Sequence, residues 1–171
     1  GISGTTDGAV MMREADIAMY LAKGQGKGRY AVFEPTMHLN VVRGFELRSD
    51  LEHAVERGQF TLVYQPIVQL ATGRPVAVEA LLRWNHPNRG QLPPLEFVPL
   101  AEATGLIMPI GRWVLDEACR ALARITSLID APDLRMAVNL SPIQLTDPLL
   151  VPAVARAIEE HGLPPGGLIL E

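Results

Sequence analysis

Short apolar segments alternate with longer segments of helical periodicity from residue 76 to residue 171, and this alternation limits the folds open to the chain. The predicted order is strand, helix, strand, helix, strand, with the strands at 76–84, 134–141 and 167–171. Helices of this length between apolar strands are typical of parallel βα units. The sequence therefore predicts an α/β fold, and both a doubly wound sheet and a closed barrel agree with this order.

The segment before residue 76 extends the sheet by one strand. Residues 60–70 read as an apolar strand, and "ATGRP" at 71–75 reads as a turn. Together with the strand at 76–84 they predict a β-hairpin. Residues 85–94, rich in Pro, Asn and Gly, are predicted to be a loop.

Upstream of the hairpin the periodicity is helical. Apolar residues at helical spacing predict helices at Ala9–Lys23 and at about 41–57, the second stopped by Gly58. A short strand is predicted between them at 29–34. The glycine-rich "GQGKG" follows a helix instead of preceding one, so it is not a dinucleotide or Walker phosphate loop.

Two helix starts are predicted after the strand at 134–141. Ser141 can cap a helix, with Pro142 at its first position and Gln144 completing a capping box. Asp147 followed by Pro148 is a second signal of the same kind.

Composition excludes several classes of protein. The 171 residues carry a formal net charge of -4, so no broad basic surface for duplex nucleic acid is expected. The single cysteine, Cys119, excludes an intrachain disulfide and disfavours a cysteine zinc site, and we expect it to be buried in a helix. We expect neither a signal peptide nor a membrane segment in this chain. Its first residue is Gly and its last lies in a predicted strand, so we expect a piece of a longer protein.

Polar side chains interrupt the apolar strands. Strand alternation puts Glu79 and Arg83 on one face of their strand, and it likewise puts Asn139 on one face of the next. Gln65 lies in the first strand of the hairpin, and Glu171 ends the last strand. Several strands therefore bring oxygen-bearing side chains toward their carboxyl ends, where parallel barrels place their chemistry.

Burying an unpaired carboxylate costs several kcal/mol, and two neighbouring carboxylates also repel each other. A divalent cation between them lowers this cost. Glu79, Asn139 and Glu171 offer hard oxygen ligands, which suit Mg²⁺ or Mn²⁺ and do not suit zinc. On pattern alone three alternatives stay open: Glu79 and Arg83 form a buried ion pair, Asn139 satisfies backbone groups, and Gln65 marks a strand end.

The segments "EALLRW", "FVPLAE", "VNLSPIQL" and the closing "LILE" follow one another along the chain. In this order and spacing they resemble the EAL domain, the cyclic-di-GMP phosphodiesterase module of bacterial signalling. The name motif falls on Glu79, Ala80 and Leu81, and the resemblance runs from about residue 45 to residue 171.

The first part of the chain resembles another family. "GISG" and "ADIAMYLAKGQGKGRYAVFE" are similar to the end of a GGDEF (diguanylate cyclase) domain, whose name motif this chain lacks. The resemblance implies a short α+β remnant of GGDEF type at 1–36, a linker at 37–44 and the first part of an EAL domain at 45–171. It also implies phosphate contacts from Lys23 and Lys27, which we expect to be ordinary solvated lysines here because the rest of that active site is absent from the chain.

The EAL resemblance implies part of a (β/α)₈ TIM-like barrel with an antiparallel strand near its start. It implies metal binding by Glu79, Asn139 and Glu171, with Glu79 catalytic and Mg²⁺ or Mn²⁺ as cofactor. Gln65 and Arg83 would contact cyclic-di-GMP, which is hydrolysed to linear pGpG. The arginine suits a phosphate because its planar donors match the oxygens.

The family also uses a pair of Asp ligands, a Lys and further Glu and Gln residues on later strands, which would follow Glu171. We therefore expect this chain alone to be inactive and the full-length protein to be the enzyme. Two other functions fit the same residues: a degenerate domain that senses cyclic-di-GMP without cutting it, and a scaffold for homodimer formation. The resemblance implies a cytoplasmic protein and leaves a membrane anchor upstream open.

Overall fold

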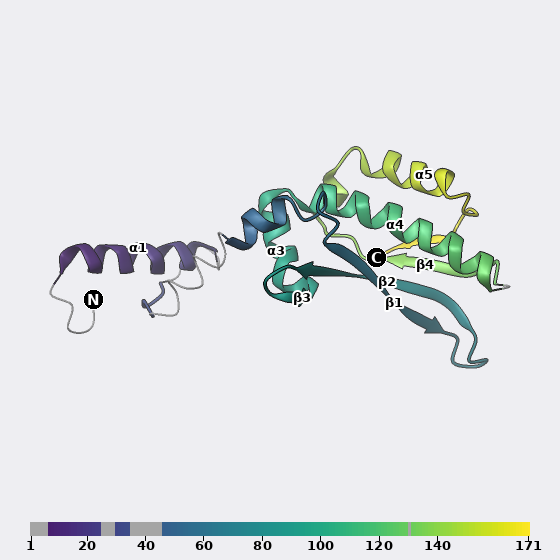
Figure 1. Cartoon of the computed structure of the whole chain (residues 1–171), viewed down its shortest axis with the longest axis horizontal. Helices are drawn as coiled ribbons and strands as arrows, with labels where there is room; N and C mark the ends of the chain where they lie inside the picture. The colour runs from purple at the N-terminus through teal and green to yellow at the C-terminus, as the bar shows by residue number, and fades with distance from the viewer. Residues whose placement is uncertain (1–6, 25–29, 35–45, 130) are drawn as a thin grey trace. The chain divides into compact units, whose positions relative to one another are not determined.

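The computed structural model of the protein describes residues 7–24, 30–34, 46–129 and 131–171 (Figure 1). The chain divides into two compact units, Gly1–Asp50 and Leu51–Glu171. The linker expected at 37–44 lies outside the described residues. Every helix in the described ranges is too short or too polar to cross a lipid bilayer.

The first unit contains one long helix, α1 (Gly8–Gly24), which confirms the helix predicted there. The Asp7 carboxylate accepts the backbone N–H of Ala9 at 2.9 Å and so satisfies one donor of the first turn. The strand predicted at 29–34 is wrong for its described part, because residues 30–34 are not in a strand. An extended segment becomes a strand only by pairing with another, and no residue in the described ranges pairs with this one.

The second unit is built on a mixed sheet. Its main strands follow the order β1 (Phe60–Val68), β2 (Pro75–His86), β4 (Arg135–Val138) and β5 (Leu168–Leu170). β1 runs antiparallel to β2, whereas β2, β4 and β5 are mutually parallel. The predicted hairpin and the predicted parallel units are both confirmed.

A second hairpin replaces the loop predicted at 85–94. β2 continues to His86, and β3 (Gly90–Leu92) pairs with it in antiparallel register, so the loop prediction is wrong for most of this range. Gly90 has a φ of 69°, a conformation that glycine adopts without strain and that closes this tight turn. The Asn85 side chain also accepts the Gln91 side-chain amide at 3.1 Å, which fixes the register.

The helix predicted at 41–57 is shorter than expected. Of its described residues, 46–52 are helical and 53–58 form turns. The N–H groups of Ala54 and Gly58 donate to Leu51 and Val55, three residues back, at 3.2 and 3.0 Å. These tight i−3 bonds interrupt the helical i−4 pattern, although the N–H of Arg57 still donates to His53 at 3.0 Å. Gly58, with a φ of 61°, ends the turns before β1.

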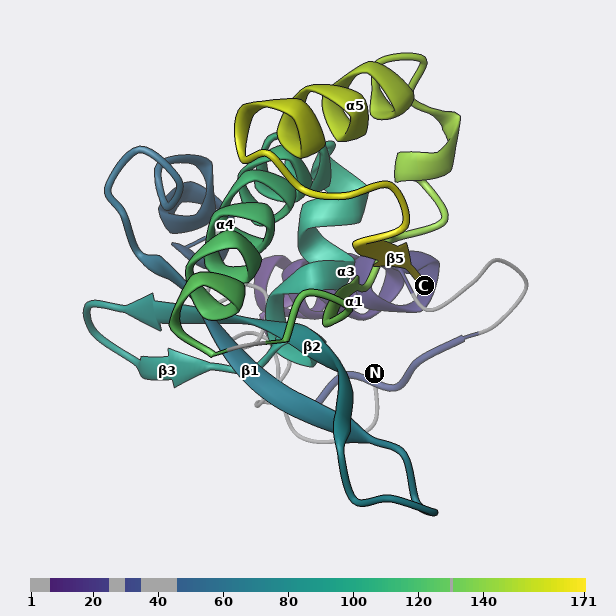
Figure 2. The same cartoon turned by 90° about the vertical axis from the view of Figure 1, so that its right-hand side faces the viewer.

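Helices cover one face of the sheet (Figure 2). α3 (Pro94–Thr104) packs on β2, and α4 (Ile107–Leu128) packs on β1 and β4. Alternate strand residues are buried beneath them, and the largest is Trp84, which is fully buried. The rings of Phe60, Trp84, Phe97 and Trp113 form a cluster with neighbouring centroids 5.6–6.0 Å apart. This aromatic core lies between the sheet and the helices, so α3 and α4 leave the opposite face of the sheet uncovered.

The connection from β4 to β5 begins differently from the prediction. The capping signal at Ser141 leads only to a short 3-10 turn, η1 (Gln144–Thr146), and the helix α5 (Leu150–Glu160) starts after the second signal. There Asp147 accepts the backbone N–H of Leu149 at 2.9 Å and pairs with Arg112 of α4 at 3.0 Å. The Leu149 bond and then the Arg112 bond hold the pKa of Asp147 below its usual range.

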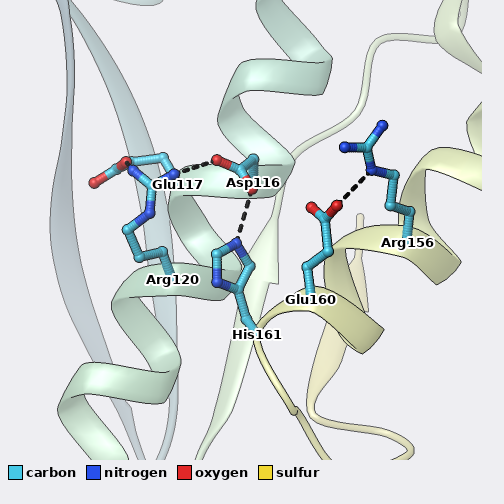
Figure 3. A network of polar contacts seen from close by, with 6 residues as sticks. All are labelled: Asp116, Glu117, Arg120, Arg156, Glu160 and His161. Carbon is cyan, nitrogen blue, oxygen red and sulfur yellow. Dashed lines mark hydrogen bonds and ion pairs between the residues drawn. The ribbon is translucent and has the colours of Figure 1, made fainter.

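α5 lies beside α4, and polar side chains connect the two helices (Figure 3). Asp116 of α4 pairs with His161, which follows α5, at 2.8 Å and with Arg120 at 2.5 Å. Arg120 also binds Glu117 at 2.6 Å. This network lies on the helical layer, remote from the opposite face of the sheet.

Candidate metal and phosphate site

Two of the predicted ligands meet on the face of the sheet that the helices leave open. The Asn139 side-chain amide Nδ2 donates to Glu79 Oε1 at 2.7 Å, although the residues are 60 positions apart. Glu79 is half-buried and Asn139 is exposed. Because Nδ2 makes this bond, the bond does not use the amide oxygen, which is the atom that would bind a cation.

The strand register explains why these side chains meet. Glu79 pairs with Ala137 in the parallel ladder of β2 and β4, so the two residues share a face. Asn139 lies two residues beyond Ala137 and therefore points to the same face, just past the end of β4. β2 itself continues seven residues past Glu79, to His86, because it also pairs with β1 and β3.

Backbone hydrogen bonds place Glu171 beside Asn139. The N–H of Glu171 donates to Val138 at 3.0 Å, and its carbonyl accepts the N–H of Leu140 at 2.8 Å. The ladder of β4 and β5 thus continues by one step and sets Glu171 opposite Asn139. Its side chain is exposed. The structure therefore joins two predicted ligands directly and places the third on the adjacent strand.

Gln65 and Arg83 flank this pair on the same face. Gln65 lies directly opposite Glu79 in the antiparallel register, and its side chain is exposed. Arg83 lies four residues beyond Glu79 and is half-buried, with Nη1 donating to the carbonyl of Leu82 at 2.8 Å. Glu79 and Arg83 are both described residues, and they do not form the ion pair considered above.

The donor set agrees with a hard divalent cation. Carboxylate and amide oxygens are the ligands that Mg²⁺ and Mn²⁺ prefer, and two side chains that carry such oxygens, Glu79 and Asn139, meet here. Within the described ranges, no three His, Cys, Asp or Glu side chains cluster so as to hold a metal. The predicted set has only two acids and one amide, so it is not a cluster of that kind.

The two lysines of the first unit are placed only in part. Lys23 belongs to α1, in the unit Gly1–Asp50. Lys27 lies outside the described residues. Their expected phosphate contacts therefore stay a prediction.

The sequence interpretation missed one polar residue behind the site. The Ser141 hydroxyl donates to Glu102 Oε1 of α3 at 2.5 Å. Ser141 was predicted to cap a helix, whereas Glu102, the last residue of "FVPLAE", was assigned no role of its own in a mainly apolar helix. A carboxylate between apolar neighbours, as in "PLAEAT", is a weak signal for such a residue.

Comparison with known proteins agrees with this geometry. Residues 48–171 match the family model of the EAL domain. The bifunctional diguanylate cyclase/cyclic di-GMP phosphodiesterase MucR of Pseudomonas aeruginosa is 48% identical over 161 residues, which are 94% of this chain and 23% of MucR. The cyclic di-GMP phosphodiesterase PdeR of Escherichia coli is 39% identical over 155 residues, which are 91% of this chain and 23% of PdeR.

A solved structure of one of these relatives has a similar fold. A solved structure of the MucR phosphodiesterase in complex with c-di-GMP superposes with a TM-score of 0.70 at 49% identity, covering 73% of this chain and 50% of that one. The chain thus spans about a quarter of the two whole relatives and half of the solved domain. The mixed α/β fold and the family match agree, and the chain belongs to the EAL domain family, which is of TIM-barrel type.

Proposed function

We propose that the intact protein hydrolyses cyclic-di-GMP to linear pGpG with Mg²⁺ or Mn²⁺. The observation that carries this proposal is the 2.7 Å contact between Glu79 and Asn139 on the open face of the sheet. Support also comes from the relatives MucR and PdeR, whose names state a cyclic di-GMP phosphodiesterase, and from the c-di-GMP complex of MucR.

Each residue of the site has a separate task in this proposal. Glu79, Asn139 and Glu171 would hold the cation through their side-chain oxygens. A bound divalent cation supplies Lewis-acid stabilisation of charge that develops on phosphoryl oxygens and lowers the pKa of water. Arg83 binds a phosphate of the dinucleotide through its guanidinium donors. Gln65, opposite Glu79, contributes amide contacts that orient the dinucleotide beside the ligands.

The upstream unit has a proposed origin as well. Residues 1–36 would be the last part of a GGDEF domain, with 45–171 the start of the EAL domain in a partial (β/α)₈ barrel. The alignment with MucR supports this, because its 161 residues extend upstream of the EAL match at 48–171. Lys23 and Lys27 would then be vestigial phosphate contacts. A cyclic dinucleotide messenger would place the protein in the cytoplasm.

The direct test is turnover of cyclic-di-GMP by the intact protein with Mg²⁺ or Mn²⁺, with pGpG measured by chromatography. We expect Glu79→Ala to lower kcat by about 100-fold or more, because it removes a ligand from the site. Glu117→Ala is the matched control, since this glutamate binds Arg120 on the helical layer, and it should keep wild-type turnover. The 171-residue chain alone should show no turnover, because Asn139 and Glu171 are exposed on an open sheet face.

Two outcomes would contradict the proposal. Tight binding of cyclic-di-GMP without any pGpG, in either metal, would identify a sensor. A protein that neither binds nor cuts the nucleotide, and whose EAL domain instead mediates homodimer formation, would identify a scaffold. Turnover by the 171-residue chain, free of contaminating enzyme, would show that the exposed half of the site is sufficient.

A further inference from the structure

The segment that follows Asn139 is fixed by a buried serine. Ser141 is 9% exposed, and its hydroxyl donates to Glu102 Oε1 at 2.5 Å. The Ser141 Oγ in turn accepts the backbone N–H of Ile143 at 3.2 Å. One side chain therefore connects the end of β4, the following turn and α3.

A glutamine fixes the same turn from the other side. Gln144 is 5% exposed, and its Oε1 accepts the backbone N–H of Ser141 at 3.0 Å. The Gln144 amide packs against α4 at Gly111, where a Cβ atom would overlap Nε2. Only a glycine leaves room for this contact. The turn is thereby held against α3 and α4 at two neighbouring points.

These contacts leave the backbone of Asn139 little freedom. On its amino side, the carbonyl of Val138 accepts the N–H of Glu171 at 3.0 Å, and on its carboxyl side the N–H of Leu140 donates to Glu171 at 2.8 Å. Ser141 then continues into the buried turn. An exposed side chain on a mobile loop would lose rotational and backbone freedom on binding a cation, whereas a fixed backbone has already lost part of it.

We propose that Ser141 and Glu102 are positioning residues for the cation site, acting through the backbone of Asn139. The inference rests on the metal site of the proposed function, and it assigns a task to the carboxylate that the sequence interpretation missed. Glu102 accepts the hydroxyl proton of Ser141, Ser141 fixes residues 139–143, and Asn139 is thereby held beside Glu79. Neither Ser141 nor Glu102 is expected to touch the cation or the nucleotide.

The test is the affinity of the intact protein for Mn²⁺ without nucleotide, measured from the electron paramagnetic resonance signal of free Mn²⁺. We expect Glu102→Ala and Ser141→Ala to weaken binding by about 10-fold, the lower end of what residues behind metal ligands contribute. Glu102→Gln keeps an oxygen acceptor for Ser141 and should stay within about threefold of wild type. Thr126→Ala is the control, because its hydroxyl donates to Leu122 within α4.

Thermal unfolding and circular dichroism accompany each titration, so that binding is compared only among folded proteins. If the alanine variants do not fold, Glu102→Asp replaces them. It keeps the charge but shortens the reach to Ser141, and it should weaken Mn²⁺ binding about 10-fold, whereas Glu102→Gln should not. Folded variants that lower the melting temperature but keep wild-type Mn²⁺ affinity would overturn the inference, because the network would then be structural only.

The outcome is separable from that of the proposed function. A wild-type protein that binds Mn²⁺ through Glu79 and Asn139 but makes no pGpG would refute the hydrolase and still allow the positioning test to be read. A wild-type protein without any Mn²⁺ site dependent on Asn139 would overturn the positioning inference itself.

Discussion

At the scale of single residues, the question is why an apolar strand carries a carboxylate and a guanidinium on one face. Glu79 is half-buried and binds Asn139, so its charge is placed beside a polar partner on the open side of the sheet. Arg83 binds the carbonyl of Leu82 with one guanidinium nitrogen and keeps further donors in a planar fork. The two charges therefore have separate partners, which agrees with one cation site and one phosphate site.

Replacing Arg83 by lysine tests the phosphate site. Lysine keeps the charge but loses the bidentate geometry, and a hydrogen bond to a charged group contributes about 1.5–3 kcal/mol. We expect Arg83→Lys to weaken cyclic-di-GMP binding by about 10- to 100-fold in calorimetric titrations of the intact protein, with Mn²⁺ affinity unchanged. Arg74→Lys is the matched control, because Arg74 lies at the exposed tip of the first hairpin. Equal losses in the two variants, or none, would remove Arg83 from the site.

At the scale of elements, the sequence predicted strand and helix types better than their ends. The period-2 pattern of β2 and the helical period of α4 are long and regular, so both elements were predicted from local physics. β3 was missed because three residues carry no period, and only their pairing with 84–86 makes them a strand. The contact of Glu79 with Asn139 could be anticipated from strand faces. The contact of Glu102 with Ser141 could not, since it joins a helix to a turn and no strand alternation relates the two residues.

The buried face of α4 leads to a prediction about its thiol. Cys119 is fully buried, and burial, with a smaller effect of Asp116, raises its pKa from 9.0 to about 11. Two pKa units lower the thiolate fraction about 100-fold at pH 8, and only the thiolate reacts. We expect alkylation of Cys119 by iodoacetamide to be at least about 100-fold slower in native protein than in guanidinium chloride, followed by peptide mass spectrometry.

The raised pKa of Cys119 also predicts how the free energy of unfolding changes with pH. The folded state holds the thiol proton more tightly than the unfolded state, so Cys119 does not lower the free energy of unfolding below pH 9.0. Above that pH the unfolded state loses its proton first, and stability falls until about pH 11. Cys119→Ala should remove this part of the alkaline decrease. Rapid alkylation of native protein at pH 8 would instead mean that α4 opens from the sheet.

At the scale of the whole molecule, the sheet of the second unit, Leu51–Glu171, has one face that helices cover and one face that they leave open. The helices bury the aromatic core on one side of the sheet, whereas on the other side Val63 and Ile67 are 38% and 37% exposed. The predicted metal ligands Glu79, Asn139 and Glu171 lie on that open side, together with Gln65 and Arg83. The turn that follows Asn139 is bonded to Gln144 and to Glu102 of α3 on the covered side, so the covered side fixes the backbone next to one of the site residues.

The central claim is that Glu79 and Asn139 hold one and the same divalent ion. The most direct measurement is the Mn²⁺ affinity of four intact proteins: wild type, Glu79→Ala, Asn139→Ala and the double variant. If both side chains bind one ion, each single variant should lose about 10-fold or more, and the double variant should lose much less than the product of the two. Independent, multiplicative losses, or wild-type affinity in either single variant, would contradict the claim.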